Sequence, residues 1–152
     1  MFFEEFKIGQ RFECDPIIVK SEEMLDFAAN YDPHPIHTDS DYAANTMFNG
    51  VISSGFLTLS SAWGQWIRTG KFGNEFIVGN GMDYVKFTAP VRENELLTSV
   101  VEVVDLTPSS SHPERGKITI NFTVTNQHGE VVMLTQIKAL LKTKAAMLVD
   151  QL

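Results

Sequence analysis

The sequence has a single cysteine, Cys14, and no second thiol with which it could pair. An internal disulfide framework is therefore excluded, and a reducing compartment is the expected setting. Long apolar runs are also missing, since no stretch of this chain approaches the roughly 20 residues that a membrane helix needs. The first residues lack the basic and apolar segments of a signal peptide. We expect a soluble protein of the cytoplasm.

Positive charge is scarce as well. The chain has 12 lysines and arginines against 19 aspartates and glutamates, which gives a formal net charge of -7. Binding to nucleic acid and to anionic bilayers needs clustered basic side chains. The charge balance therefore argues against nucleic acids and membranes as partners.

The overall composition of the chain is typical of a globular protein. Hydrophobic residues make up 43% and charged residues 20% of the 152 positions, a balance typical of folded domains and not of disordered chains. This length suits one domain, and no repeat or linker divides the sequence. We expect residues 1–152 to form a single domain.

The first half of the chain contains signals for short helices, which are interrupted by prolines. Ser21 is a suitable N-cap for a helix that runs to Tyr31, with two glutamates in its first turn. Pro33 and Pro35 end that pattern, because proline disrupts a helix interior. We therefore expect a loop at residues 31–38.

A longer helix is expected at residues 54–68. Its positions are apolar or small on nearly every face, and its one charge, Arg68, stands at the end, shortly before the helix-stopping Gly70. A helix without a polar face is typical of a buried position. We therefore expect this helix to be covered on most sides.

After Gly73 the apolar residues recur at every second position, which is the period of a β-strand. The expected strands lie at residues 77–87, 96–104, 117–125 and 131–141, with a further strand near residues 12–19. Gly79 and Gly81 predict a bulge in the first long strand, and residues 107–116 are expected to form an exposed loop. A curved antiparallel sheet wrapped around the long helix, an α+β architecture, accounts for both patterns.

Asp32 and His37 stand five residues apart in the proline-rich segment. Prolines on both sides of His34 reduce the freedom of the backbone, which suits side chains that must be held in place. A carboxylate and a neutral imidazole form a workable acid/base pair at neutral pH. We predict that Asp32 and His37 are catalytic. The alternative is an Asp that caps a turn and a His that binds the backbone.

Gly55 opens the long helix eighteen residues after His37. A helix N-terminus presents free backbone N–H groups and a partial positive charge. Such donors suit an oxyanion that develops on a carbonyl group, and a glycine lets a substrate approach the backbone closely. The N–H of Gly55 is therefore the expected oxyanion donor.

Three segments together resemble a known family. Residues 32–39 read Asp-Pro-His-Pro-Ile-His-Thr-Asp, residues 48–57 read Phe-Asn-Gly-Val-Ile-Ser-Ser-Gly-Phe-Leu, and residues 85–91 read Val-Lys-Phe-Thr-Ala-Pro-Val. These patterns are similar to those of the MaoC-like dehydratases, the (R)-specific enoyl-CoA hydratase group. The resemblance implies a hot-dog domain that adds water to the double bond of an enoyl thioester, or removes it.

The resemblance also implies roles for the predicted residues. Asp32 and His37 would share one water molecule, activate it and deliver its proton in a syn addition, while the Gly55 N–H holds the thioester oxygen. Coenzyme A would enter as part of the substrate, and no separate cofactor is implied. Tyr31 stands where the family has glycine, and His34 where it has an asparagine that orients the carboxylate. His34 is expected to support Asp32 in a similar way.

The remaining candidates have supporting roles. Asp39 is expected to be the N-cap of a short helix at residues 41–44 and not an acid catalyst. His-x-x-His without further ligands at zinc spacing is a weak metal signal, so no metal site is predicted. Candidate substrate-binding residues, which are otherwise simply core, are Phe48, Ile52, Ser54, Phe56 and Met82.

Two other functions stay open. A hot-dog thioesterase would use a carboxylate elsewhere on the fold, and the Asp–His spacing argues against it. A non-catalytic module that binds acyl thioesters is consistent with the changes at Tyr31 and His34, either of which would then fill the water site. The expected partners are an acyl-CoA or acyl carrier protein thioester and a second copy of the chain, paired through the sheet edges.

Overall fold

The computed structural model describes residues 1–149. Its strands are β1 (Arg11–Glu13), β2 (Ile17–Ile18), β3 (Phe76–Phe87), β4 (Leu96–Pro108), β5 (Arg115–Thr125) and β6 (Val131–Lys142). Its helices are α1 (Ser21–Tyr31), α2 (Pro35–Thr38), α3 (Ser40–Ala44), α4 (Gly55–Arg68) and α5 (Ala146–Val149), with 3-10 turns η1 at Phe3–Glu5 and η2 at Gly73–Glu75.

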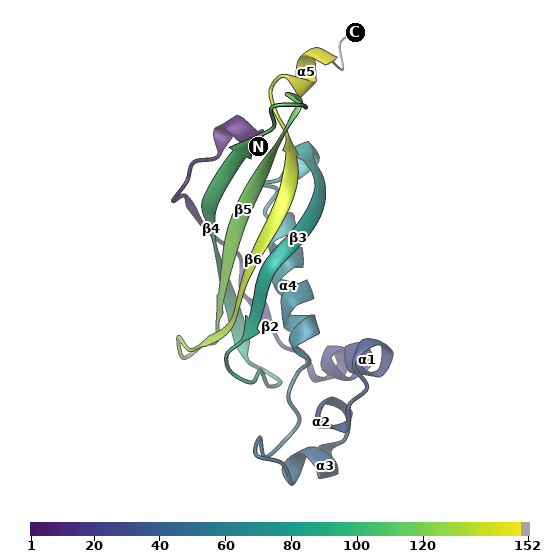
Figure 1. Ribbon diagram of the computed structural model, residues 1–152. Coiled ribbons are helices and arrows are strands. Elements are labelled where there is room, and N and C mark those ends of the chain that lie inside the picture. Colours follow the sequence, from purple (N-terminus) through teal and green to yellow (C-terminus); the bar gives the residue numbers. More distant parts are fainter. Residues whose placement is uncertain (150–152) are drawn as a thin grey trace.

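The strands form one curved antiparallel sheet in the order β1-β4-β5-β6-β3, and β2 also pairs with β4 (Figure 1). The alternation of apolar residues that predicted β5 also explains how the strand packs. Ile118, Ile120 and Phe122 lie on one face of β5, and that face is buried in the core. The bulge predicted in β3 is confirmed, since its register against β6 shifts between Gly79 and Gly81.

One strand prediction and one loop prediction need correction. The segment near residues 12–19 is not one strand but two short ones, β1 and β2, which pair separately with β4. Pro16 lies between them and has no backbone N–H to continue the ladder. The loop expected at residues 107–116 is shorter than predicted, because Pro108 pairs with Gly116 and extends the β4–β5 hairpin.

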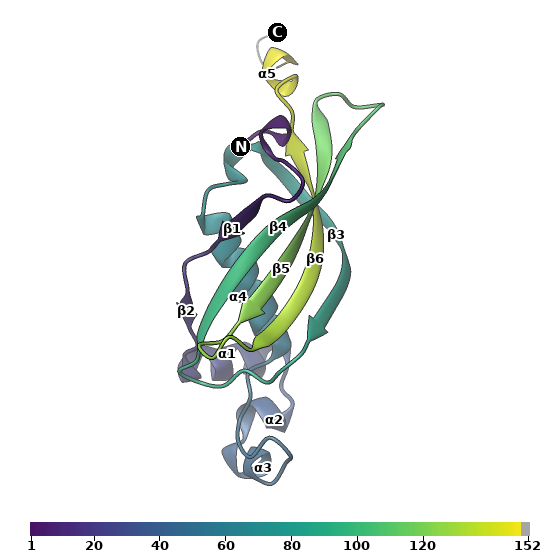
Figure 2. The same cartoon turned by 90° about the vertical axis from the view of Figure 1, so that its left-hand side faces the viewer.

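Helix α4 lies along the concave face of the sheet (Figures 1 and 2). Its side toward the sheet is buried, and Trp66 there is 0% exposed, with its ring centroid 5.0 Å from that of Phe72 and 5.4 Å from that of Phe12. Aromatic pairs of this kind contribute about 0.5–1.5 kcal/mol beyond their buried area. The expectation that this helix is covered on most sides is wrong for the single chain, since Phe56 is 58% and Ile67 39% exposed.

Helices α1, α2 and α3 gather at the N-terminal end of α4, beyond the end of the sheet (Figures 1 and 2). Ser21 is the first residue of α1, and its predicted role as N-cap is wrong because Lys20 holds that position. The loop predicted at residues 31–38 contains the helix α2. Pro35 starts that helix, where the missing N–H costs nothing because a first-turn N–H has no intrahelical acceptor. No helix of residues 1–149 has the length and apolarity to cross a membrane.

Candidate functional site

Asp32 sits at the end of α1. It is the C-cap residue, with φ -154° and ψ 68°, and its N–H still donates to the carbonyl of Ala28 at 2.9 Å. Pro33 follows and prevents the helix from continuing. The local sequence therefore fixes where the Asp32 backbone leaves the helix, and its side chain is 28% exposed.

His37 lies on α2, and the side chain of His34 caps the start of that helix. The Nδ1 atom of His34 accepts a hydrogen bond from the N–H of Ile36 at 3.1 Å, so His34 is the N-cap of the helix. The Nδ1 atom of His37 lies 2.7 Å from the carbonyl oxygen of Ile52. Because a carbonyl only accepts, Nδ1 of His37 carries a proton and donates it there.

The two predicted catalytic side chains meet. Nε2 of His37 lies 3.2 Å from Oδ2 of Asp32. With Nδ1 protonated, a neutral His37 presents a lone pair on Nε2, and an ionised Asp32 presents only lone pairs. Either a proton lies between the two atoms or a water molecule donates to both. The pair is therefore arranged to exchange a proton with a water molecule or a substrate.

The N-terminus of α4 faces the same region. Gly55 is its first helical residue, and within residues 1–149 its N–H donates to no protein acceptor. A Cβ atom at position 55 would stand 2.6 Å from Cζ of Phe87, so a side chain there would have to displace that ring. The Phe87 ring thus fills the space over the Cα atom of Gly55. The sequence analysis instead expected a substrate to approach the backbone at this glycine.

A cavity of about 460 Å³ joins these groups. Asp32, His37 and Gly55 all line it. So do three of the predicted substrate-binding residues, Phe48, Ile52 and Phe56. The sequence prediction missed the rest of the lining, which consists of Ser53, Thr58, Phe87, Thr88, Ala89, Pro90, Val91 and Val132. Most of these residues lie in the segment 85–91, whose resemblance to the family could have indicated them.

Other predicted residues lie elsewhere. Ser54 does not line the cavity and is 1% exposed. Met82 lines a different cavity, with Trp63 and the bulge of β3. Tyr31 is 74% exposed and, like His34, does not line the cavity that contains Asp32 and His37. The predicted N-cap role of Asp39 is confirmed, since its Oδ1 accepts from two backbone N–H groups of α3 at 3.0 Å.

His34 does not support Asp32 as expected. Its Nδ1 is occupied by the helix-capping bond to Ile36, and its ring centroid lies 6.5 Å from that of His37. No hydrogen bond joins His34 to Asp32 within the described residues 1–149. The departure from the family pattern at this position therefore has a local structural role.

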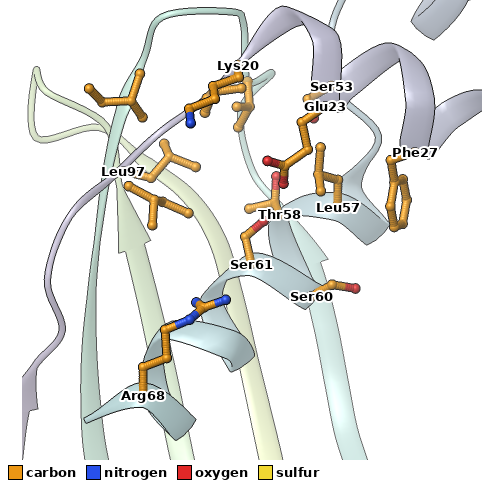
Figure 3. Close-up of a pocket in the computed structure, with 14 residues that line it drawn as sticks. Lys20, Glu23, Phe27, Ser53, Leu57, Thr58, Ser60, Ser61, Arg68 and Leu97 are labelled. Atoms are coloured by element: carbon orange, nitrogen blue, oxygen red, sulfur yellow. The ribbon is translucent and has the colours of Figure 1, made fainter.

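A second cavity, of about 410 Å³, lies beside α4 and is lined from Leu57 to Arg68 of that helix (Figure 3). Lys20, Glu23 and Arg68 extend toward it in Figure 3. It shares Ser53, Thr58 and Val91 with the cavity that contains Asp32 and His37, so these residues separate the two spaces. None of the predicted catalytic residues lines the second cavity.

Within residues 1–149 the structure has no cluster of three or more histidine, cysteine or acidic side chains able to hold a metal ion. The Nε2 atom of His37 lies 3.2 Å from Oδ2 of Asp32, and its Nδ1 atom lies 2.7 Å from the carbonyl oxygen of Ile52.

Comparisons with known proteins identify the family of the chain. The family model described as "MaoC like domain" matches residues 4–130. The uncharacterized protein YdeM of Bacillus subtilis (strain 168) is 33% identical over 142 residues, which cover 93% of this chain and 99% of YdeM. An (R)-specific enoyl-CoA hydratase of Rhodospirillum rubrum is 32% identical over 116 residues, which cover 70% of this chain and 72% of that protein.

Solved structures show the same fold. The crystal structure of the MaoC-like dehydratase from Rhodospirillum rubrum has a TM-score of 0.88 and 28% sequence identity, and the match covers 95% of this chain and 98% of that one. The predicted α+β hot-dog architecture, a curved antiparallel sheet along a central helix, is thereby confirmed. The chain belongs to the MaoC-like domain family.

Proposed function

We propose that this chain adds water to the double bond of an enoyl thioester, giving an (R)-3-hydroxyacyl thioester, or catalyses the reverse dehydration. One observation carries the proposal: Asp32, His37 and the Gly55 N–H line a single cavity. The similarity to an (R)-specific enoyl-CoA hydratase supports the reaction class and the stereochemistry.

In the proposed reaction a water molecule is held between Asp32 and His37. Its oxygen forms a bond to the β-carbon as one of its protons passes to the pair, and the electrons of the double bond move toward the thioester carbonyl. The pair then returns a proton to the α-carbon on the same face, so that water is added without other reactants. Dehydration follows the same steps in reverse.

The two parts of the site contribute in different ways. A positioned acid/base pair accelerates a reaction by about 10²–10⁴-fold. The N–H of Gly55 would stabilise the negative charge that develops on the thioester oxygen, and an oxyanion donor of this kind contributes on the order of 3 kcal/mol. Its N–H has no acceptor among residues 1–149, so it can donate to the substrate.

Two other functions fit the site less well. A non-catalytic binding module was expected to fill the water site with Tyr31 or His34, and neither residue lines the cavity. A thioesterase would direct water at the carbonyl carbon and release the free thiol. The similarity to an (R)-specific enoyl-CoA hydratase favours addition of water to the double bond instead.

The proposed function is tested by incubating the purified chain with crotonyl-CoA and with longer enoyl-CoA substrates. Hydration removes the absorbance of the conjugated thioester without releasing a free thiol, and chiral analysis identifies the product. We expect the (R)-3-hydroxyacyl thioester. Release of free coenzyme A would identify a thioesterase, and binding without conversion would identify a binding module.

The lining of the cavity indicates where the carrier of the acyl group lies. No lysine or arginine is among the described residues that line it. The phosphates of coenzyme A, or the phosphopantetheine of an acyl carrier protein, would therefore lie outside the cavity, with the acyl part inside. The assay is for this reason run with both carriers.

We also propose that two copies pair through β3. This strand occupies one edge of the sheet in residues 1–149, is twelve residues long, and exposes Ile77, Val78 and Met82. A long apolar edge is a template for pairing with another strand. Antiparallel pairing of β3 with its copy would form one continuous sheet and bring the exposed face of α4 toward the interface.

A further inference from the structure

Ser54 joins the two halves of the catalytic site. It is the N-cap of α4, directly before Gly55, and it is 1% exposed. Its Oγ accepts a hydrogen bond from the N–H of Phe56 at 3.2 Å and lies 2.8 Å from Oδ2 of Asp32. Because the carboxylate only accepts, the single hydroxyl proton of Ser54 is directed at Asp32.

This bond selects one orientation of the Asp32 carboxylate. Oδ2 faces both Ser54, at 2.8 Å, and His37, at 3.2 Å. Within residues 1–149 Oδ1 has no hydrogen-bond partner. A freely rotating carboxylate would exchange its two oxygens, whereas a hydroxyl held by the helix N-terminus keeps Oδ2 toward both Ser54 and His37.

The same hydroxyl couples the acid/base pair to the expected oxyanion donor. Ser54 is fixed by the first turn of α4, whose first residue supplies the Gly55 N–H. Asp32, by contrast, comes from the end of α1, 22 residues earlier in the chain. One buried atom, Oγ of Ser54, therefore sets the position of the carboxylate relative to that N–H.

We infer that Ser54 is a positioning residue for Asp32, and not a substrate-binding residue. The inference rests on the proposed function, since it assigns Ser54 a role in the same hydration. It also explains why His34 is free to cap α2: the support for the carboxylate comes from Ser54 instead. Misplacement of a catalytic group by about 1 Å can cost up to roughly a hundredfold in rate.

The test removes the hydroxyl in two ways and restores it in a third. Ser54→Ala removes both the helix cap and the bond to Asp32, whereas Ser54→Gly removes the hydroxyl but leaves a residue that helices accept at the N-cap. Ser54→Thr restores the hydroxyl. The control is Ser60→Ala on the same helix, whose hydroxyl donates to the carbonyl of Phe56 and does not bond Asp32.

We expect kcat to fall by about ten- to a hundredfold in both Ser54→Ala and Ser54→Gly. KM should change little, because Ser54 does not line the cavity. Ser54→Thr should recover most of kcat, and Ser60→Ala should match the wild type. A wild-type kcat in Ser54→Gly, or a change in KM alone, would overturn the inference.

A crystal structure of Ser54→Gly separates this inference from the proposed function. If Ser54 positions Asp32, the contact between Asp32 and His37 lengthens beyond hydrogen-bond distance, whether or not the wild type hydrates enoyl thioesters. An unchanged contact would overturn the inference even in an active enzyme. A wild type that hydrates no enoyl thioester, with a displaced Asp32 in the variant, would refute only the reaction.

Discussion

His37 faces Asp32 with its Nε2 atom 3.2 Å from Oδ2, while its other ring nitrogen lies 2.7 Å from the carbonyl of Ile52. The backbone carbonyl determines which nitrogen carries the proton in the neutral ring. His37 therefore presents a lone pair, and not an N–H, toward the carboxylate when it is neutral. That arrangement requires a shared proton or a bridging water molecule, and it is the basis of the proposed acid/base pair.

The tautomer of His37 is directly measurable. We expect nitrogen-15 NMR of the neutral ring to show Nδ1 protonated, because the carbonyl of Ile52 accepts that proton. His128, in the turn after β5, provides a reference ring with no bond of this kind to its side chain among the hydrogen bonds of residues 1–149. A neutral His37 with its proton on Nε2 would contradict the geometry.

Substitution by alanine is expected to destabilise the fold to different extents at Gly116 and at Gly55. A Cβ atom on Gly116 would stand 2.7 Å from the ring of Phe3, which is 7% exposed and cannot move aside. Gly55→Ala meets the far edge of the Phe87 ring, which is 50% exposed and can rotate outward. We expect Gly116→Ala to lower the free energy of unfolding by about 1–3 kcal/mol, and Gly55→Ala to lower it less.

Denaturant unfolding of both variants measures this difference. The double variant Gly55→Ala with Phe87→Leu is the control, because the shorter side chain removes the contact. If Gly55→Ala destabilised the chain more than Gly116→Ala, the Phe87 ring would have to be held more rigidly than its exposure indicates.

Cys14 should be unreactive in the folded chain. It is 3% exposed, and burial, aided by the charge of Asp15, raises the pKa of its thiol. A raised pKa leaves less of the reactive thiolate at pH 8. We expect a colorimetric thiol reagent to modify Cys14 slowly in buffer and rapidly in denaturant. Equal rates in both would show that the residue is accessible.

The proposed dimer predicts the effect of a charge in the middle of β3. A two-fold axis that pairs β3 with its copy brings the centre of the strand, near Met82, against itself. Met82→Lys would then place two like charges close together and weaken the dimer. Ile8→Lys is the matched control, since Ile8 is also exposed, at 64%, but lies far from β3 in the sequence and before the sheet begins.

Sedimentation of the three proteins tests this pairing. We expect a dimer for the wild type and for Ile8→Lys, and a shift toward monomer for Met82→Lys. A monomeric wild type at micromolar concentration, or a dimer unaffected by the charge on β3, would refute this interface.

Local patterns predicted much of the fold. The period-two alternation placed β5 and β6, and the sequence Ser-Ser-Gly placed the start of α4 within one residue. Asp39 was predicted as an N-cap because its short side chain can reach the N–H groups two and three residues on. These features depend on neighbours in the sequence, so the sequence alone contains the required information.

The errors concern contacts between distant residues. One face of α4 is exposed to solvent because the sheet covers only the opposite face. The composition of the helix does not reveal this difference between its faces. The error at His34 is the local exception, since this residue caps its own helix, whereas Ser54 donates to Asp32 across 22 positions. Similarly, the ring that packs over Gly55 belongs to Phe87, at the end of β3. Side-chain direction in the folded chain decides such pairs, and spacing does not encode it.

The most direct test compares the wild type with Asp32→Asn and His37→Ala in the hydration of an enoyl thioester. Both variants keep the neighbouring caps and prolines, so circular dichroism should show an unchanged fold. The account predicts a loss of kcat/KM of at least about a hundredfold in each, with the loss in the double variant much smaller than the product of the two, because the residues act on one water molecule. Wild-type rates in either variant would show that the Asp32–His37 pair does not perform the chemistry.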